Sequence, residues 1–247
     1  MNRKRLSACV ALILVASCAA ESSGADELSL GQVAKAAKTY LRDTAEFPLW
    51  MKVEVTATDS SGHVRSHKKG RVDYDFHGYN QTAGHAAFKL RGPDPVIRAA
   101  FAAASASMMV SNVLSLKAED NFTFSSLESG LPDVVTGRLT PIAKCQPLEW
   151  YSDASGPKIF CGSSEYQLEK QELTLRHFSF DAHGLPAVGD IEPLGLATIA
   201  RYHVDIDFQK VFLAEDPKPF LVPKLITVTV ETDKGKLVIV SDCSSKN

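Results

Sequence analysis

Four of the seven histidines in this sequence lie close together along the chain and could ligate a metal ion. The group consists of His63, His67, His77 and His85, which fall within 23 residues. Their odd numbers would place neighbours on one face of a strand. A metal site would need two or three of them to converge with a carboxylate such as Asp73 or Asp75. A turn and an irregularity at Gly70 lie between the histidines, so we expect no metal site.

A second polar group lies near the end of the chain. His203, Asp205 and Asp207 alternate with apolar residues, so on a strand they would share one face. The residues between them form the apolar set that is typical of a buried strand face. We therefore interpret these three side chains as the solvated face of a strand rather than as metal ligands.

Catalytic motifs with a local sequence pattern are absent. The sequence contains no GxSxG, HExxH, P-loop or GxGxxG pattern. Gly162, Ser163 and Ser164 form a loop-like stretch, not a nucleophile elbow, and no pattern of glycoside chemistry surrounds Glu169 and Glu172. We therefore expect a protein that is not an enzyme and that uses no cofactor.

Composition limits the class of partner. The chain has 247 residues, 45% of them hydrophobic, and a formal net charge of −2. This length suits one globular domain with a core of its own. The charge balance and the lack of a stretch dense in lysine and arginine argue against a nucleic-acid partner.

The N-terminus has the features of an export signal. Basic residues at 3–5 precede an apolar run at 6–16, which is too short for a bilayer anchor of ~20 residues. The run ends in Val15-Ala16-Ser17-Cys18, an order that is similar to the lipobox of bacterial lipoproteins. We expect a signal peptide at 1–17 and lipid attachment at Cys18.

A short tether is expected between the anchor and the fold. Residues 19–26 are small and polar, so a flexible tether is expected at 18–28 and a single domain at 29–247. The lipid would hold this domain on the periplasmic side of a bacterial membrane. The alternative is plain secretion into the periplasm or beyond, with cleavage after a small residue such as Ala20 or Ala25.

Three cysteines fall within the expected domain. Cys145 and Cys161 flank a loop rich in proline, glycine and serine, and an oxidising compartment would allow a disulfide between them. Closing a loop of this size would stabilise the fold by about 3 kcal/mol. Cys243 is then left over, although its pairing with either of the other two stays open.

Hydrophobic periodicity predicts one large antiparallel sheet with two helices. A capping-box pattern at Ser29 begins a helix that reaches Leu41, and a run without charge at 99–116 predicts a buried helix inserted between strands. The apolar phase shifts between Leu175 and Phe178, which predicts a bulge there. Strands are predicted at 49–58, 64–76, 86–90, 122–126, 134–140, 166–171, 173–181, 202–209, 222–231 and 237–240. The fold class is therefore α+β, with about ten strands.

The order of these elements resembles the periplasmic lipoprotein-carrier family (LolA/LolB-like). The resemblance lies in an export signal, an N-terminal helix, a meander, an inserted apolar helix and closing strands. Its most specific part is the ending, YHVDIDFQKV followed by FLVPKLITVTVETDKGKLVIV. It implies a strongly curved sheet, or half-barrel, whose cavity receives lipid or acyl chains. The cysteine loop and the lipobox depart from the pattern of a soluble shuttle.

Two functional hypotheses follow. In the first, an envelope lipoprotein binds a hydrophobic small molecule or lipid between its sheet and its inserted helix, where alanines leave room. The residues expected to line this cavity are Phe101, Met108, Met109, Val110 and Leu114, with Trp50 and Met51 as weaker candidates. In the second, a fully packed structural module binds an envelope protein partner, with Trp150 and Tyr151 as anchors.

Overall fold

The computed structural model describes residues 29–33, 35, 47–77, 88–110, 122–142, 162–183, 188–213 and 216–245. Several predictions fall outside this part of the chain and stay predictions. They concern the signal peptide at 1–17, the tether at 18–28, Cys18, Leu114, Cys145, Trp150, Tyr151 and Cys161.

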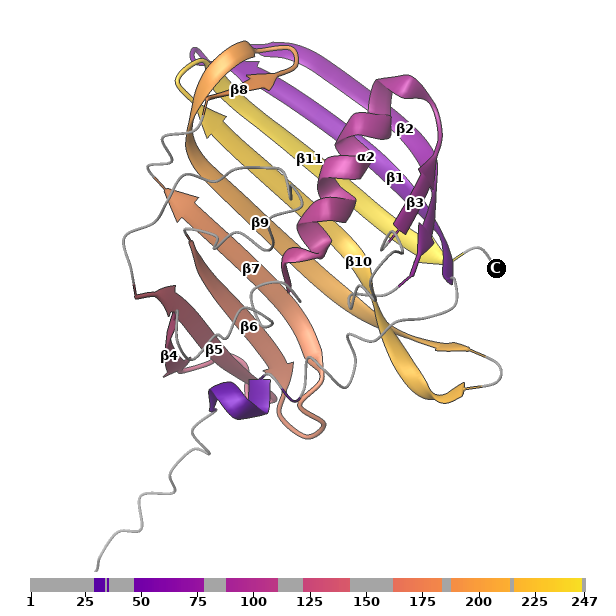
Figure 1. Cartoon of the computed structure of the whole chain (residues 1–247), viewed down its shortest axis with the longest axis vertical. Helices are drawn as coiled ribbons and strands as arrows, with labels where there is room; N and C mark the ends of the chain where they lie inside the picture. Colours follow the sequence, from indigo (N-terminus) through magenta and orange to yellow (C-terminus); the bar gives the residue numbers. More distant parts are fainter. Residues whose placement is uncertain are drawn as a thin grey trace, which may run out of the picture.

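One antiparallel sheet dominates the described fold (Figure 1). Its strands are β1 (Phe47–Asp59), β2 (Val64–Phe76), β3 (Phe88–Arg91), β4 (Phe122–Leu127), β5 (Val134–Pro141), β6 (Ser163–Glu169), β7 (Leu175–His183), β8 (Val188–Ile191), β9 (Gly195–Leu213), β10 (Asp216–Thr232) and β11 (Gly235–Ser245). The spatial order is β3-β2-β1-β11-β10-β9-β7-β6-β5-β4, and β8 pairs with the first part of β9. In the described part of the chain, β3 and β4 end this order without meeting, so the sheet is open. The prediction of a curved antiparallel sheet in an α+β fold is confirmed.

The sheet buries one of its faces and exposes the other. In β1, Leu49, Met51 and Val53 are at most 2% exposed, whereas Lys52 between them is exposed. Helix α2 (Asp94–Ser107) lies across the buried, concave face and contacts β1, β2, β10 and β11 (Figure 1). The core therefore sits between this helix and the apolar side chains of the strands.

The N-terminal helix begins as its sequence predicts. Residues 30–33 and 35 are helical. The backbone N–H of Gln32 donates to the Ser29 hydroxyl at 3.2 Å, and the Ser29 N–H donates to Gln32 Oε1 at 2.7 Å. This reciprocal pair is the predicted capping box. Val33 is fully buried in the core, so the helix is fixed to the domain.

The structure confirms one predicted irregularity of the strands and adds one short strand. The predicted bulge is confirmed, because Gln167 pairs with His177 and Leu168 with Leu175, which leaves Arg176 as the extra residue. Strand β8 was not predicted, since its four residues include Gly189 and Asp190 and show no alternation.

Helix α2 starts five residues before the uncharged run that predicted it. Pro95 lies in its first turn, where a missing backbone N–H costs nothing. The helix then approaches β2 closely above Gly70. A Cβ atom at Gly70 would lie 2.5 Å from Cγ2 of Val96, a stiff side chain that is 1% exposed. Glycine at this position therefore sets how closely the helix meets the sheet.

Replacing Gly70 with alanine is expected to destabilise the fold by about 1–3 kcal/mol through this overlap. At a strand position without such an overlap, replacing glycine with alanine would stabilise the fold by roughly 0.5–1 kcal/mol. The double variant Gly70→Ala/Val96→Ala should lose at least ~1 kcal/mol less than the sum of the single changes, because it removes the colliding methyl groups. Urea unfolding measures all three variants, and additive losses would show that the helix does not press on Gly70.

Candidate functional site

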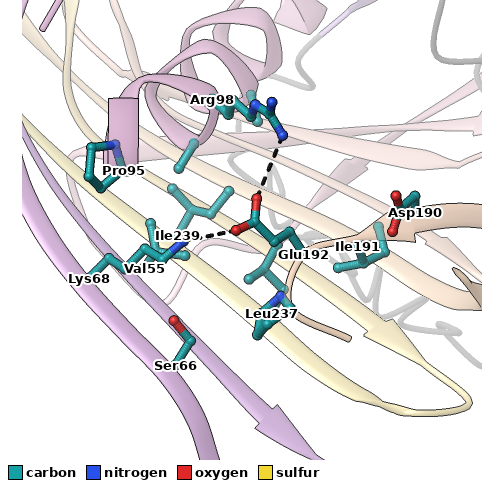
Figure 2. Close-up of a pocket in the computed structure, with 13 residues that line it drawn as sticks. Val55, Ser66, Lys68, Pro95, Arg98, Asp190, Ile191, Glu192, Leu237 and Ile239 are labelled. Atoms are coloured by element: carbon teal, nitrogen blue, oxygen red, sulfur yellow. Dashed lines mark hydrogen bonds and ion pairs between the residues drawn. The ribbon is translucent and has the colours of Figure 1, made fainter. Parts of the chain in front are cut away.

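A pocket lies between α2, the concave face of the sheet and the turn that follows β8 (Figure 2). Its floor comes from three neighbouring strands. Lys68 of β2, Val55 of β1 and Ile239 of β11 pair in one row across the sheet. In the next row, Ser66 and Leu237 flank Ala57 in the same way. The register of the strands thus gathers floor residues from distant parts of the sequence.

Small helix side chains form the opposite wall of the pocket. Ala99 and Ala102, one helical turn apart, face the strands and are both half-buried. The sequence predicts that alanines of this helix leave room above the sheet, and these two line the pocket. Ile191 and Pro193 close the side next to β8.

The pocket is small and mostly apolar. Its volume is about 210 Å³, below the roughly 300–1,000 Å³ that encloses drug-sized ligands. Branched aliphatic residues, alanines and prolines supply eight of the 13 residues that line it. Such a space suits one alkyl chain better than a lipid with several chains.

A three-residue ion-pair group forms the rim of the pocket (Figure 2). Glu192 Oε1 lies 3.1 Å from Nζ of Lys68, and Glu192 Oε2 lies 3.6 Å from Nη1 of Arg98. The hydrogen bond from Lys68 is the main cause of a lowered pKa at Glu192, and the positive charge of Arg98 adds to it. The Glu192 side chain is 63% exposed, so this rim borders solvent and the group can open at small cost.

The residues predicted to line a ligand cavity lie elsewhere in the described structure. Met108, Met109 and Val110 are at most 5% exposed and belong to the main core. Phe101 is 59% exposed, and its ring meets that of Phe88 edge-on at 5.6 Å. None of these four residues lines the pocket, and their contact with a ligand stays a prediction.

The weaker candidates are also separate from the pocket. Met51 is fully buried in the core. Trp50 points to the opposite face of the sheet, where the Arg71 guanidinium lies 3.5 Å from the centre of its ring. This cation–π contact gives Trp50 a structural role on the convex surface.

Sequence reasoning missed the polar residues of the pocket, although one signal was present. Lys68 has the same parity as Val72, Tyr74 and Phe76, the buried apolar residues of β2. A lysine in line with an apolar strand face marks either the end of the core or a site. Glu192 had no comparable signal, because its role depends on where the turn after β8 falls in space.

The predicted polar face of β9 is joined by histidine from β7. His177 Nδ1 lies 2.8 Å from Asp207 Oδ1, and His203 Nε2 lies 2.7 Å from Asp205 Oδ2. Among the described residues, no group of histidines, cysteines and carboxylates has the geometry of a metal site. These contacts join histidines to aspartates on the convex face of the sheet.

These ion pairs predict a pH dependence of stability. Asp205, and then Asp207, raise the pKa of His177 above its usual 6.5. The stabilisation is thus complete below about pH 6.5 and is lost as pH rises through the raised pKa. We expect the free energy of unfolding to fall by up to ~1 kcal/mol across that range. Urea unfolding between pH 5.5 and 8.5 measures it.

The matched variants are His177→Gln and, at an exposed turn, His63→Gln. In His177→Gln the free energy of unfolding should no longer fall above pH 6. In His63→Gln it should depend on pH as in the parent chain. A steep profile that persists in His177→Gln would assign the pH dependence to other groups.

Cys243 is a free thiol in the core. It is 2% exposed, and burial raises the pKa of its thiol so that it stays protonated. The structure therefore shows neither of the pairings of Cys243 that the sequence left open. In the described part of the chain, no helix has both the length and the apolar character needed to cross a membrane.

Together, the fold and the pocket define an open antiparallel α+β sheet with a helix across its concave face and a small apolar site beneath that helix. No family model matches the chain, and no curated protein matches it. Among solved structures, the chain is similar to a domain from Vibrio parahaemolyticus that has been assigned to outer membrane lipoprotein sorting. The identity is 11%, the TM-score is 0.33, and the match covers 88% of this chain and 91% of that chain. At this distance, functional inference has to come from the residues of the chain itself.

Proposed function

We propose that this protein is a non-catalytic component of the bacterial envelope that binds a hydrophobic ligand beneath helix α2. The observation that carries the proposal is the apolar pocket between Ala99 and Ala102 of the helix and Val55, Leu237 and Ile239 of the sheet. Burying an alkyl chain there would contribute about 0.8 kcal/mol for each methylene group. No covalent step is required.

The N-terminal sequence supports the envelope location. A lipid on Cys18 would tether the domain to a membrane, and membranes are the source of alkyl chains. The mechanism is then uptake of one chain into the pocket, with the helix covering it and the ion-paired rim closing the opening toward water.

The test uses the full chain with Cys18→Ser, exported by its own signal. This variant carries no lipid on residue 18, so once its intact mass shows that the signal has been removed, any lipid in its organic extract has to come from a binding site. We expect mass spectrometry to detect a bound alkyl compound, or the protein to take up one equivalent of a fluorescent acyl probe that decanol displaces. An empty protein that takes up no probe would contradict the proposal and favour the fully packed interaction module.

A further inference from the structure

The charged residues at the rim of the pocket indicate which charge the head group of the ligand has. Two cations, one from strand β2 and one from helix α2, converge on a single carboxylate directly beside an apolar space (Figure 2). Lys68 reaches one oxygen of Glu192 and Arg98 reaches the other. This arrangement already holds one carboxylate at the mouth of the pocket.

The position of Lys68 is unusual for its strand. Lys68 pairs with Val55 of β1, and Val55 pairs in turn with Ile239 of β11. The lysine therefore extends an apolar row of the pocket floor. Its side chain is only 37% exposed. A lysine here keeps its aliphatic stem against the apolar lining and its ammonium group at the solvent edge.

Glu192 is more exposed than Lys68 and less exposed than Arg98, and its side chain can leave both cations. It belongs to the turn after β8 and is 63% exposed, so rotation into water would free both cations without exposing any of the core. A second carboxylate, Asp190, lines the same rim and would weaken, but not cancel, the attraction of the two cations for an anion.

We infer that the ligand is a single-chain amphiphile with an anionic head, which displaces Glu192 from Lys68 and Arg98 while its alkyl chain enters the pocket. This inference rests on the proposed function and adds the chemical class of the ligand. The shared chemistry is an anion at the end of one alkyl chain. A carboxylate and a phosphate both satisfy it, and the test separates them.

The test measures displacement of a fluorescent acyl probe from the full chain by four ten-carbon compounds, each below its micelle-forming concentration. These are decanoate, decyl phosphate, decanol and decyltrimethylammonium. We expect at least one of the two anions to bind about 3- to 10-fold more tightly than decanol, as two partly exposed ion pairs allow. The preference should shrink in 0.5 M salt.

Variants assign the preference to the rim. Lys68→Gln should reduce the preference for the anion to about one, and Glu192→Gln should strengthen anion binding ~2- to 5-fold by removing the competing carboxylate. The matched control is Lys69→Gln, because Lys69 is the next residue of β2 and pairs with Glu54 on the opposite face at 3.1 Å. It should leave the preference unchanged.

Each outcome decides a different claim. Equal binding of all four compounds, or tighter binding of the ammonium compound, would overturn the inference and leave the proposed function intact. A preference for the anions that Lys68→Gln does not alter would also overturn it. Failure of every compound and of the probe to bind would instead contradict the proposed function.

Discussion

Replacing Ala102 with phenylalanine is expected to abolish uptake of an alkyl ligand. Ala102 lines the pocket from the helix side, and a phenyl ring there would occupy much of a space of about 210 Å³. Losing the burial of only two methylene groups costs about 1.6 kcal/mol, which weakens affinity more than tenfold. Titration with a fluorescent acyl probe measures the loss.

The control for this variant is Ser105→Phe. Ser105 lies on the same helix, is also half-buried, and is not part of the pocket lining. It should retain probe binding, and urea unfolding should show that both variants fold. Probe affinity that survives in Ala102→Phe would place the ligand somewhere other than the pocket under α2.

Replacing Gly235 with alanine is expected to cause a large loss of stability, about 3 kcal/mol. Gly235 has φ +149°, a conformation that side chains disfavour. Its Cβ would also lie 2.0 Å from the carbonyl oxygen of Thr58 and 2.8 Å from Cα of Asp59. Because these are backbone atoms of the paired strand β1, relief requires the end of the β1–β11 ladder, where Asp59 pairs with Gly235, to separate.

Gly62→Ala separates the two causes of this loss. Gly62 also has a positive φ, of +84°, but nothing lies within 4 Å of the position of a Cβ. It should cost only about 1 kcal/mol, from backbone strain alone. Thermal and urea unfolding compare the two variants, and equal losses would mean that β1 does not approach Gly235 this closely.

The strands could be predicted because burial of one face of the sheet requires apolar and polar residues to alternate along each strand. Tyr202, Val204 and Ile206 are at most 1% exposed, and the polar residues between them lie on the other face. The bulge at Arg176 was visible for the same reason, since an extra residue shifts the phase. Such signals are local, so a single sequence contains them.

The pocket could not be predicted in the same way. It joins Lys68, Ala99, Glu192 and Leu237, which are brought together by strand register and by the path of the turn after β8. Neither is encoded in a local pattern. Bulk and apolar character are the properties that predict lining residues from sequence, and they are equally typical of core residues such as Met108.

Photocrosslinking can locate a bound alkyl chain directly on the protein. A ten-carbon fatty acid with a photoreactive diazirine in its chain would be irradiated with the full Cys18→Ser chain, and peptide mass spectrometry would map the adducts. We expect adducts at the helix residues 99–102 and on the strand residues 237–239, and we expect excess decanoate to suppress them and Ala102→Phe to abolish them. Adducts confined to other segments, or labelling that excess decanoate does not reduce, would contradict a ligand site under helix α2.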